Sequence, residues 1–205
     1  MSPVFDADVL EIPASVRAEM IGRSWHDVPD CLPFSALRLL SLPYVGMDGA
    51  VHRGELVVAA DVAREVVAIF ERLFDARFPI ARMERVDVFD GDDDRSMAAN
   101  NTSAFNHRRI AGGTKVSHHA LGVAIDLNPR WNPMILGGVV HPPSAVDSVD
   151  RAIRRPGWIG RPGVVVETFE AFGWEWGGDW PDLLDYHHFS RIRRDDLPGV
   201  TTTPP

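Results

Sequence analysis

The chain has 205 residues, of which 45% are hydrophobic, and it carries a formal net charge of −8. This length and composition fit a single globular domain with a sizeable core, and the acidic balance disfavours nucleic acid as a partner. A single cysteine excludes an intramolecular disulfide and a cysteine-rich zinc cage, so a bound metal would need histidine and carboxylate ligands. We find no stretch with the length and apolarity of a membrane span, and the N-terminus lacks the features of a signal peptide.

The first fifty residues are rich in proline and short apolar pieces, and they predict only a short helix over residues 14–20. A short β-prone piece follows at residues 55–58. Apolar residues from Val62 to Phe74 then recur at helical spacing, which predicts a longer helix with one face on the core. Asp61 is the expected N-cap of this helix, and Pro79 lies at or just beyond its end.

The middle of the chain predicts shorter elements. Residues 83–90 alternate as a half-buried strand, and the acidic run 91–94 after them predicts a solvated turn rather than a calcium site. Residues 100–113 predict a polar loop. Residues 122–129 predict a strand that is closed by Asn-Pro.

The last third alternates between irregular and regular pieces. Residues 130–163 hold many prolines and glycines and predict a long loop. Residues 164–173 predict a helix that ends at its glycine. Residues 174–180 and 185–190 predict short strands or turns, and we expect residues 196–205 to form a disordered tail.

Four of the eight histidines form two adjacent pairs, His118–His119 and His187–His188. Asp126 lies in an apolar run, where a bare carboxylate is costly to bury unless it is paired or binds a metal. Strand alternation places Asp126 opposite to Ile125 and Leu127, so its side chain can face a cleft. Gly122 permits a turn that folds His119 back beside Asp126. A histidine and a carboxylate are two of the three protein ligands of a catalytic zinc site.

The third ligand has to come from elsewhere, and the second histidine pair offers both His187 and His188. Asp185 lies three residues before His188, so a bend or bulge is needed for both side chains to reach one site. Any one of these residues alone is better explained as a surface histidine or a salt-bridge partner. Together, the spacings His-x6-Asp and Asp-x2-His favour a metal. Of the tryptophans at 174, 176 and 180, we expect at least two in the core rather than in a cleft wall.

The pattern S-x-H-x-x-G-x-A-x-D is complete in Ser117, His119, Gly122, Ala124 and Asp126. Residues 176–180 add W-G-G-D-W, and residues 185–189 add D-Y-x-H-F. With these motifs the chain resembles the zinc D-alanyl-D-alanine carboxypeptidase and L-alanyl-D-glutamate peptidase family, whose fold is shared with the hedgehog signalling domain. The resemblance covers the chain from about residue 54 to residue 189. It is closest to the L-alanyl-D-glutamate endopeptidase branch, which includes phage endolysins.

The resemblance implies specific roles for five residues. His119, Asp126 and His188 would bind one zinc ion, a Lewis acid that polarises the scissile carbonyl and activates water. Asp185 would be the general base. Arg108 would contact the substrate and its developing oxyanion.

Two further residues, Ser117 and His187, are expected beside the ligands or the substrate. The family often has glutamine where His187 stands and glutamate where Ser190 stands. The implied function is hydrolysis of a peptide bond in peptidoglycan stem peptides at the cell wall, with an L-Ala-D-Glu endopeptidase as the first choice. Two alternatives stay open. One is a D-Ala-D-Ala carboxypeptidase or dipeptidase, and the other is a zinc-bearing, non-hydrolytic binding or signalling domain.

We expect an α+β fold of the hedgehog and D-alanyl-D-alanine peptidase type. A small, mainly antiparallel sheet should carry the site on one face, with helices packed on the other. Residues 1–195 should form a single zinc peptidase domain and function as a monomer, although residues 1–50 carry no motif that assigns them a role.

Overall fold

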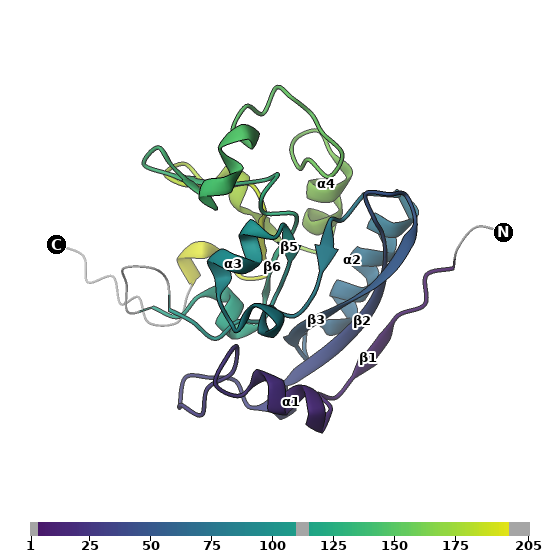
Figure 1. Ribbon diagram of the computed structural model, residues 1–205, viewed down its shortest axis with the longest axis vertical. Helices are drawn as coiled ribbons and strands as arrows, with labels where there is room; N and C mark the ends of the chain where they lie inside the picture. The colour runs from purple at the N-terminus through teal and green to yellow at the C-terminus, as the bar shows by residue number, and fades with distance from the viewer. Residues whose placement is uncertain (1–3, 110–114, 197–205) are drawn as a thin grey trace.

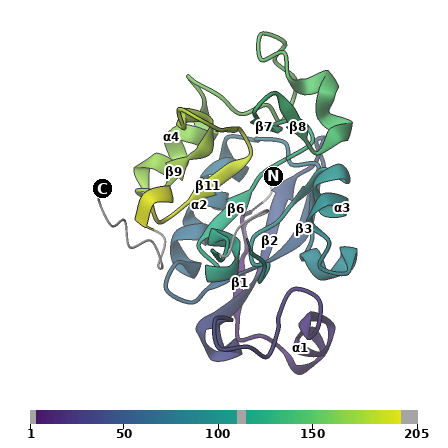
Figure 2. The same ribbon diagram turned by 90° about the vertical axis from the view of Figure 1, so that its left-hand side faces the viewer.

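The computed structural model describes residues 4–109 and 115–196, which form an α+β structure (Figures 1 and 2). The α-helices of this part are α1 (Ala14–Met20), α2 (Ala63–Asp75), α3 (Asp93–Ala98) and α4 (Val164–Ala171). Its strands are β1 (Asp8–Leu10), β2 (Leu37–Val45), β3 (Val51–Ala59), β4 (Arg82–Met83), β5 (Asn101–Thr102), β6 (Ala124–Asp126), β7 (Met134–Leu136), β8 (Val139–His141), β9 (Glu175–Trp176), β10 (Leu184–Asp185) and β11 (His188–Ser190). Short 3₁₀ helices lie at Phe34–Ala36, Val86–Phe89, His118–Leu121, Pro143–Ser148, Gly177–Asp179 and Arg194–Asp196.

The strands form four small sheets rather than one. Three are antiparallel, with the orders β1–β2–β3, β10–β7–β8 and β6–β11–β9, while β4 and β5 form a parallel pair. The α+β class and the mainly antiparallel pairing are therefore confirmed. The candidate site residues Asp126 and His188 lie on the β6–β11–β9 sheet.

Helix α2 covers one face of the β1–β2–β3 sheet (Figure 1). Its apolar stripe is buried as the helical spacing predicts, at Val62, Val66, Ile69, Phe70, Leu73 and Phe74. The main core continues from α2 through α4 to the β6–β11–β9 sheet. There the ring of Phe169 stacks on that of Phe189, with ring centroids 4.0 Å apart, so α4 packs against β11, the strand that begins with His188.

A smaller apolar cluster lies on the other side of β2 and β3. Helix α1 has the predicted bounds, residues 14–20, and it buries Val16 and Met20 against Leu37, Leu39 and Val57. The N-terminal segment therefore contributes a helix, an edge strand and the long strand β2, none of which except α1 follows from its sequence pattern.

Several local predictions were wrong. Helix α2 is capped by Val62 without a side-chain hydrogen bond, so Asp61 is not its N-cap. Residues 83–90 form only the end of β4 and a 3₁₀ helix instead of a strand. In that helix Val88 is exposed whereas Asp87 is buried, because the Ser24 hydroxyl donates a hydrogen bond to its carboxylate.

The predicted loops hold more structure than their composition indicates. The acidic run 91–94 begins with a turn but leads into α3, where Asp92 caps the helix by accepting from the backbone N–H of Arg95. Residues 100–106 are buried and include β5, and residues 134–141 form the β7–β8 hairpin. The rest of the predicted polar loop (110–113) and most of the expected tail (197–205) lie outside the described residues. Within the described ranges, every helix is too short or too polar to span a bilayer.

Candidate metal centre

A tight turn before β6 positions His119. The side-chain oxygen of Ser117 accepts a hydrogen bond from the backbone N–H of His119 and so caps the 3₁₀ helix His118–Leu121. This helix ends at Gly122, whose φ of 64° lies in the left-handed region. The chain then reverses into β6, which brings His119 beside Asp126 as the sequence predicts.

Gly122 also approaches β3 closely, since its carbonyl accepts a hydrogen bond of 2.9 Å from the Ala59 backbone N–H. A Cβ at position 122 would lie 2.6 Å from that nitrogen. We expect Gly122→Ala to lower the free energy of unfolding by more than the 1–2 kcal/mol, roughly, of left-handed strain alone. Gly137→Ala is the matched control, because Gly137 has a φ of 56° with open space around its Cβ position. Equal losses for both variants in urea denaturation would contradict this expectation.

The other two residues of the cluster face each other across a strand pair. Asp126 on β6 and His188 on β11 are direct antiparallel partners, so their side chains share one face of the sheet. The neighbours Ile125 and Leu127 point into the core, as the alternation predicts. Asp185 ends β10 in a different sheet, and a turn at residues 186–187 separates it from His188. This turn supplies the bend that lets both side chains reach one pocket.

The side chains of His119, Asp126 and His188 converge with all three ligand atoms within 4.8 Å of one another. Nε2 of His119 lies 3.2 Å from Oδ2 of Asp126, and Nδ1 of His188 lies 2.9 Å from Oδ1 of the same carboxylate. The two imidazole nitrogens are 3.3 Å apart. All three residues are buried. Two histidines and one carboxylate in this arrangement could hold a metal ion.

The hydrogen bonding of the cluster fits a cation. Nδ1 of His119 donates to the carbonyl of Ala104 at 2.6 Å, so in the neutral ring Nε2 carries a lone pair toward the cluster. That lone pair faces His188 Nδ1 and the Asp126 carboxylate, and a cation among them satisfies all three. Burial alone would raise the pKa of Asp126, but His119 and His187 hold it well below its ordinary value. Burial alone would lower the pKa of His119, and the Asp126 carboxylate raises it instead.

His118, the other member of the first pair, has a different set of contacts. Its Nδ1 is 2.7 Å from the Ser190 hydroxyl, which itself donates to the carbonyl of Ile192. The hydroxyl therefore accepts from Nδ1–H of a neutral His118. Burial, reinforced by His188 and His119, lowers the pKa of His118 to about 3. The structure thus brings His119, and not His118, to Asp126.

His187, the other member of the second pair, contacts the carboxylate of Asp185. Its Nδ1 donates to the carbonyl of Asn132 at 2.7 Å, and its Nε2 lies 3.0 Å from Oδ1 of Asp185. Burial opposes a charged His187, but the carboxylates of Asp185 and Asp126 outweigh it and raise its pKa to about 10. A divalent cation at the cluster would lower the pKa of His187, because it would repel the positive charge of the protonated ring.

The cluster opens into a pocket of about 380 Å³ that Asp185 and Arg108 also line. The side chains of Ser117 and His187 line it too, so every predicted site residue borders the same cavity. Trp180 forms part of its wall, whereas Trp174 and Trp176 are in the core, as expected for at least two of the three. The sequence did not point to Asp93, which borders this pocket from α3 and forms an ion pair with Arg108.

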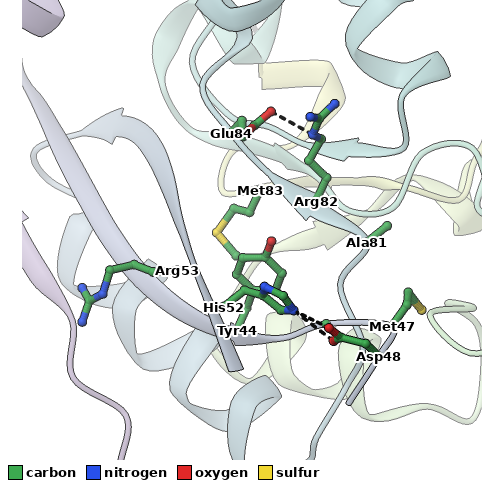
Figure 3. A pocket seen from close by; sticks show the side chains of 10 residues that line it. Tyr44, Met47, Asp48, His52, Arg53, Ala81, Arg82, Met83 and Glu84 are labelled. Carbon is green, nitrogen blue, oxygen red and sulfur yellow. Dashed lines mark hydrogen bonds and ion pairs between the residues drawn. The ribbon is translucent and has the colours of Figure 1, made fainter. Parts of the chain in front are cut away.

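A separate pocket lies between the β2–β3 turn and β4 (Figure 3). His52 lies there beside Asp48, with 2.9 Å between Nε2 and Oδ1, and Arg82 pairs with Glu84. These groups pair with one another instead of converging on a common point. This pocket therefore offers neither the ligand set nor the buried carboxylates of the His119 cluster.

The His119 cluster, with the further carboxylate of Asp185 in its pocket, has the residue types of a metal-dependent hydrolase site. Residues 111–191 match the model of a peptidase family described as D-alanyl-D-alanine carboxypeptidase. The match contains His119, Asp126, Asp185 and His188, and it supports a peptidase. Neither the comparison with curated proteins nor that with solved structures found a match.

Removal of the metal tests whether the centre supports the fold. The main core is apolar and is built largely from β2, β3, α2 and α4, and although it reaches the sheet that carries Asp126 and His188, none of the three clustered side chains belongs to it. We therefore expect a chelated protein to keep its far-ultraviolet circular dichroism and to melt at a lower temperature, because a metal that binds only the folded state stabilises it. Loss of the helical signal on chelation would show instead that the metal is needed for folding.

Proposed function

We propose that the chain is a zinc metallopeptidase that hydrolyses a peptide bond in peptidoglycan stem peptides, with residues 1–195 acting as one domain. The observation that carries this proposal is the convergence of His119, Asp126 and His188 in a pocket that Asp185 also lines. Two histidines and a carboxylate are a ligand set of catalytic zinc sites, which keep one coordination position open. When bound, zinc would supply Lewis acidity toward a carbonyl oxygen and toward water.

The remaining residues of the pocket have complementary tasks in this proposal. Asp185 accepts the proton of the attacking water and passes it to the leaving amine. Arg108 stabilises the oxyanion, a contribution on the order of 3 kcal/mol for a single donor. His187 holds Asp185 in place through their 3.0 Å contact, and Ser117 shapes the turn that carries His119.

The scissile bond distinguishes two candidate activities. Our first choice is the L-Ala-D-Glu bond, from the motifs that the sequence shares with the endopeptidase branch. The second is the D-Ala-D-Ala bond, which the description of the matching family favours. A non-hydrolytic binding or signalling domain is the third alternative, and the presence of Asp185 and Arg108 in the pocket argues against it.

Incubation of the zinc-loaded protein with purified peptidoglycan, followed by mass spectrometry, tests the proposal. New N-terminal D-Glu identifies the endopeptidase, and released D-Ala identifies the carboxypeptidase. The same preparation of His119→Ala serves as the control for contaminating hydrolases. If the wild-type protein binds peptidoglycan but releases no product, the binding alternative replaces the proposal.

A further inference from the structure

Arg108 is the single arginine among the described residues that line the catalytic pocket. Its Nη2 lies 2.6 Å from Oδ2 of Asp93, the first residue of α3. Both side chains are partly buried, with 32% of Arg108 and 22% of Asp93 exposed. Water therefore screens this pair less than it screens most ion pairs on the surface.

The backbone around Arg108 is held on both sides. The N–H of His107 donates to the carbonyl of Ser24, and the carbonyl of Arg108 accepts from the N–H of Ser117. The side-chain amide of Asn106 donates to the carbonyl of Gly91, in the turn before α3. With the backbone fixed, the direction of the guanidinium depends on the contacts of the side chain itself.

We propose that Asp93 is a positioning residue, which holds the guanidinium of Arg108 in the direction where it meets the reacting carbonyl. The inference rests on the proposed function, because it assigns Arg108 to the substrate. Asp93 contacts one terminal nitrogen of the guanidinium, Nη2. The Arg108 side chain also lines the pocket and is 32% exposed, so its terminal nitrogens keep N–H donors for an acceptor that the substrate brings.

The pair also balances charge near the metal ligands. Arg108 and Asp93 line the same pocket as His119, Asp126 and His188, so both charges lie near the cluster. A guanidinium near a divalent cation is repelled by it, and the Asp93 carboxylate offsets this repulsion. Loss of Asp93 would therefore both release Arg108 and leave its charge unbalanced.

Asp93→Asn tests the inference in the metal-loaded chain of 205 residues, with Asp94→Asn as the matched control. Asp94 is the next residue of the same helix turn and borders the same pocket, so both variants remove the same charge there, while only Asp93→Asn changes the ion pair with Arg108. We expect Asp93→Asn to lower kcat/KM by about ten- to a hundredfold, the cost of a misplaced catalytic group, with most of the loss in kcat. Metal content and melting temperature should match those of the control, and Asp93→Glu should restore part of the activity.

Two further measurements distinguish an effect of Asp93 on the position of Arg108 from an effect that does not act through Arg108. In the Arg108→Ala background, Asp93→Asn should cost nothing more, because a residue that acts only through Arg108 has no separate contribution. The ¹⁵N NMR signal of Arg108 Nε should be dispersed in the wild type and in Asp94→Asn, and move toward the random-coil position in Asp93→Asn. Additive losses, or equal losses for Asp93→Asn and Asp94→Asn, would overturn the inference. An inactive wild-type protein would overturn the proposed function, while the NMR comparison would still decide whether Asp93 orients Arg108.

Discussion

Replacing Asp185 with asparagine should leave the fold and the metal content intact and lower hydrolysis by about a hundred- to ten-thousandfold. The amide has nearly the shape of the carboxylate, but it cannot accept a proton. Asp185 lines the pocket of the His119 cluster without belonging to the three converging ligands. Turnover on peptidoglycan, measured together with metal content by elemental analysis, checks this result.

The control for Asp185 is Asp182→Asn, which removes an exposed carboxylate that pairs with Arg194. If Asp185 only supports its neighbours, metal affinity should fall together with activity, as it does when carboxylates around metal ligands are removed. The structure shows which neighbour that would be, since Asp185 contacts His187 whereas His188 bonds to Asp126. Near-wild-type turnover of a metal-loaded Asp185→Asn would remove Asp185 from the mechanism, and His187 would be the next base to test.

Replacing His119 with alanine should lower metal affinity by more than about a hundredfold, because even the outer partners of metal ligands are worth ten- to a hundredfold. His118→Ala is the matched control, since its Nδ1 bonds to Ser190 instead of facing Asp126. Titration of both purified variants with zinc gives the two affinities directly. Full metal content in His119→Ala, with loss in His118→Ala, would reverse the assignment of the ligand within the pair.

The helices were predictable because their signals are local. The bounds of α1 and the buried stripe of α2 follow from spacing within one segment. The strand β2 gives no such signal, because Leu39 and Leu40 are buried on opposite faces and the residues do not alternate. The predicted strand at residues 83–90 failed for a non-local reason. Its carboxylate at Asp87 finds a partner in Ser24, 63 residues away, so the acidic position turns inward.

In the candidate site, too, the residues with local signals were predictable, whereas contacts between distant elements were not. His119 and Asp126 were predicted together because one turn at Gly122 joins them, and the residue motif chose His188 over His187. The contact of Asp185 with His187 was not expected, since the spacing directed attention to His188. Asp93 was missed because its partner Arg108 lies on another element, and an acidic residue after a turn has no local sign of such a role.

Because Asp126 and His188 are direct strand partners, a metal that bound both of them would distinguish the correct strand register from a shifted one. A slip of one residue between β6 and β11 would turn His188 to the opposite side of its sheet, away from Asp126 and His119. Chains with a shifted register would then bind the metal weakly, whereas metal binding would stabilise the chains with the correct register. Metal supplied during refolding should accordingly raise the yield of the native form, because only one strand register forms the metal site.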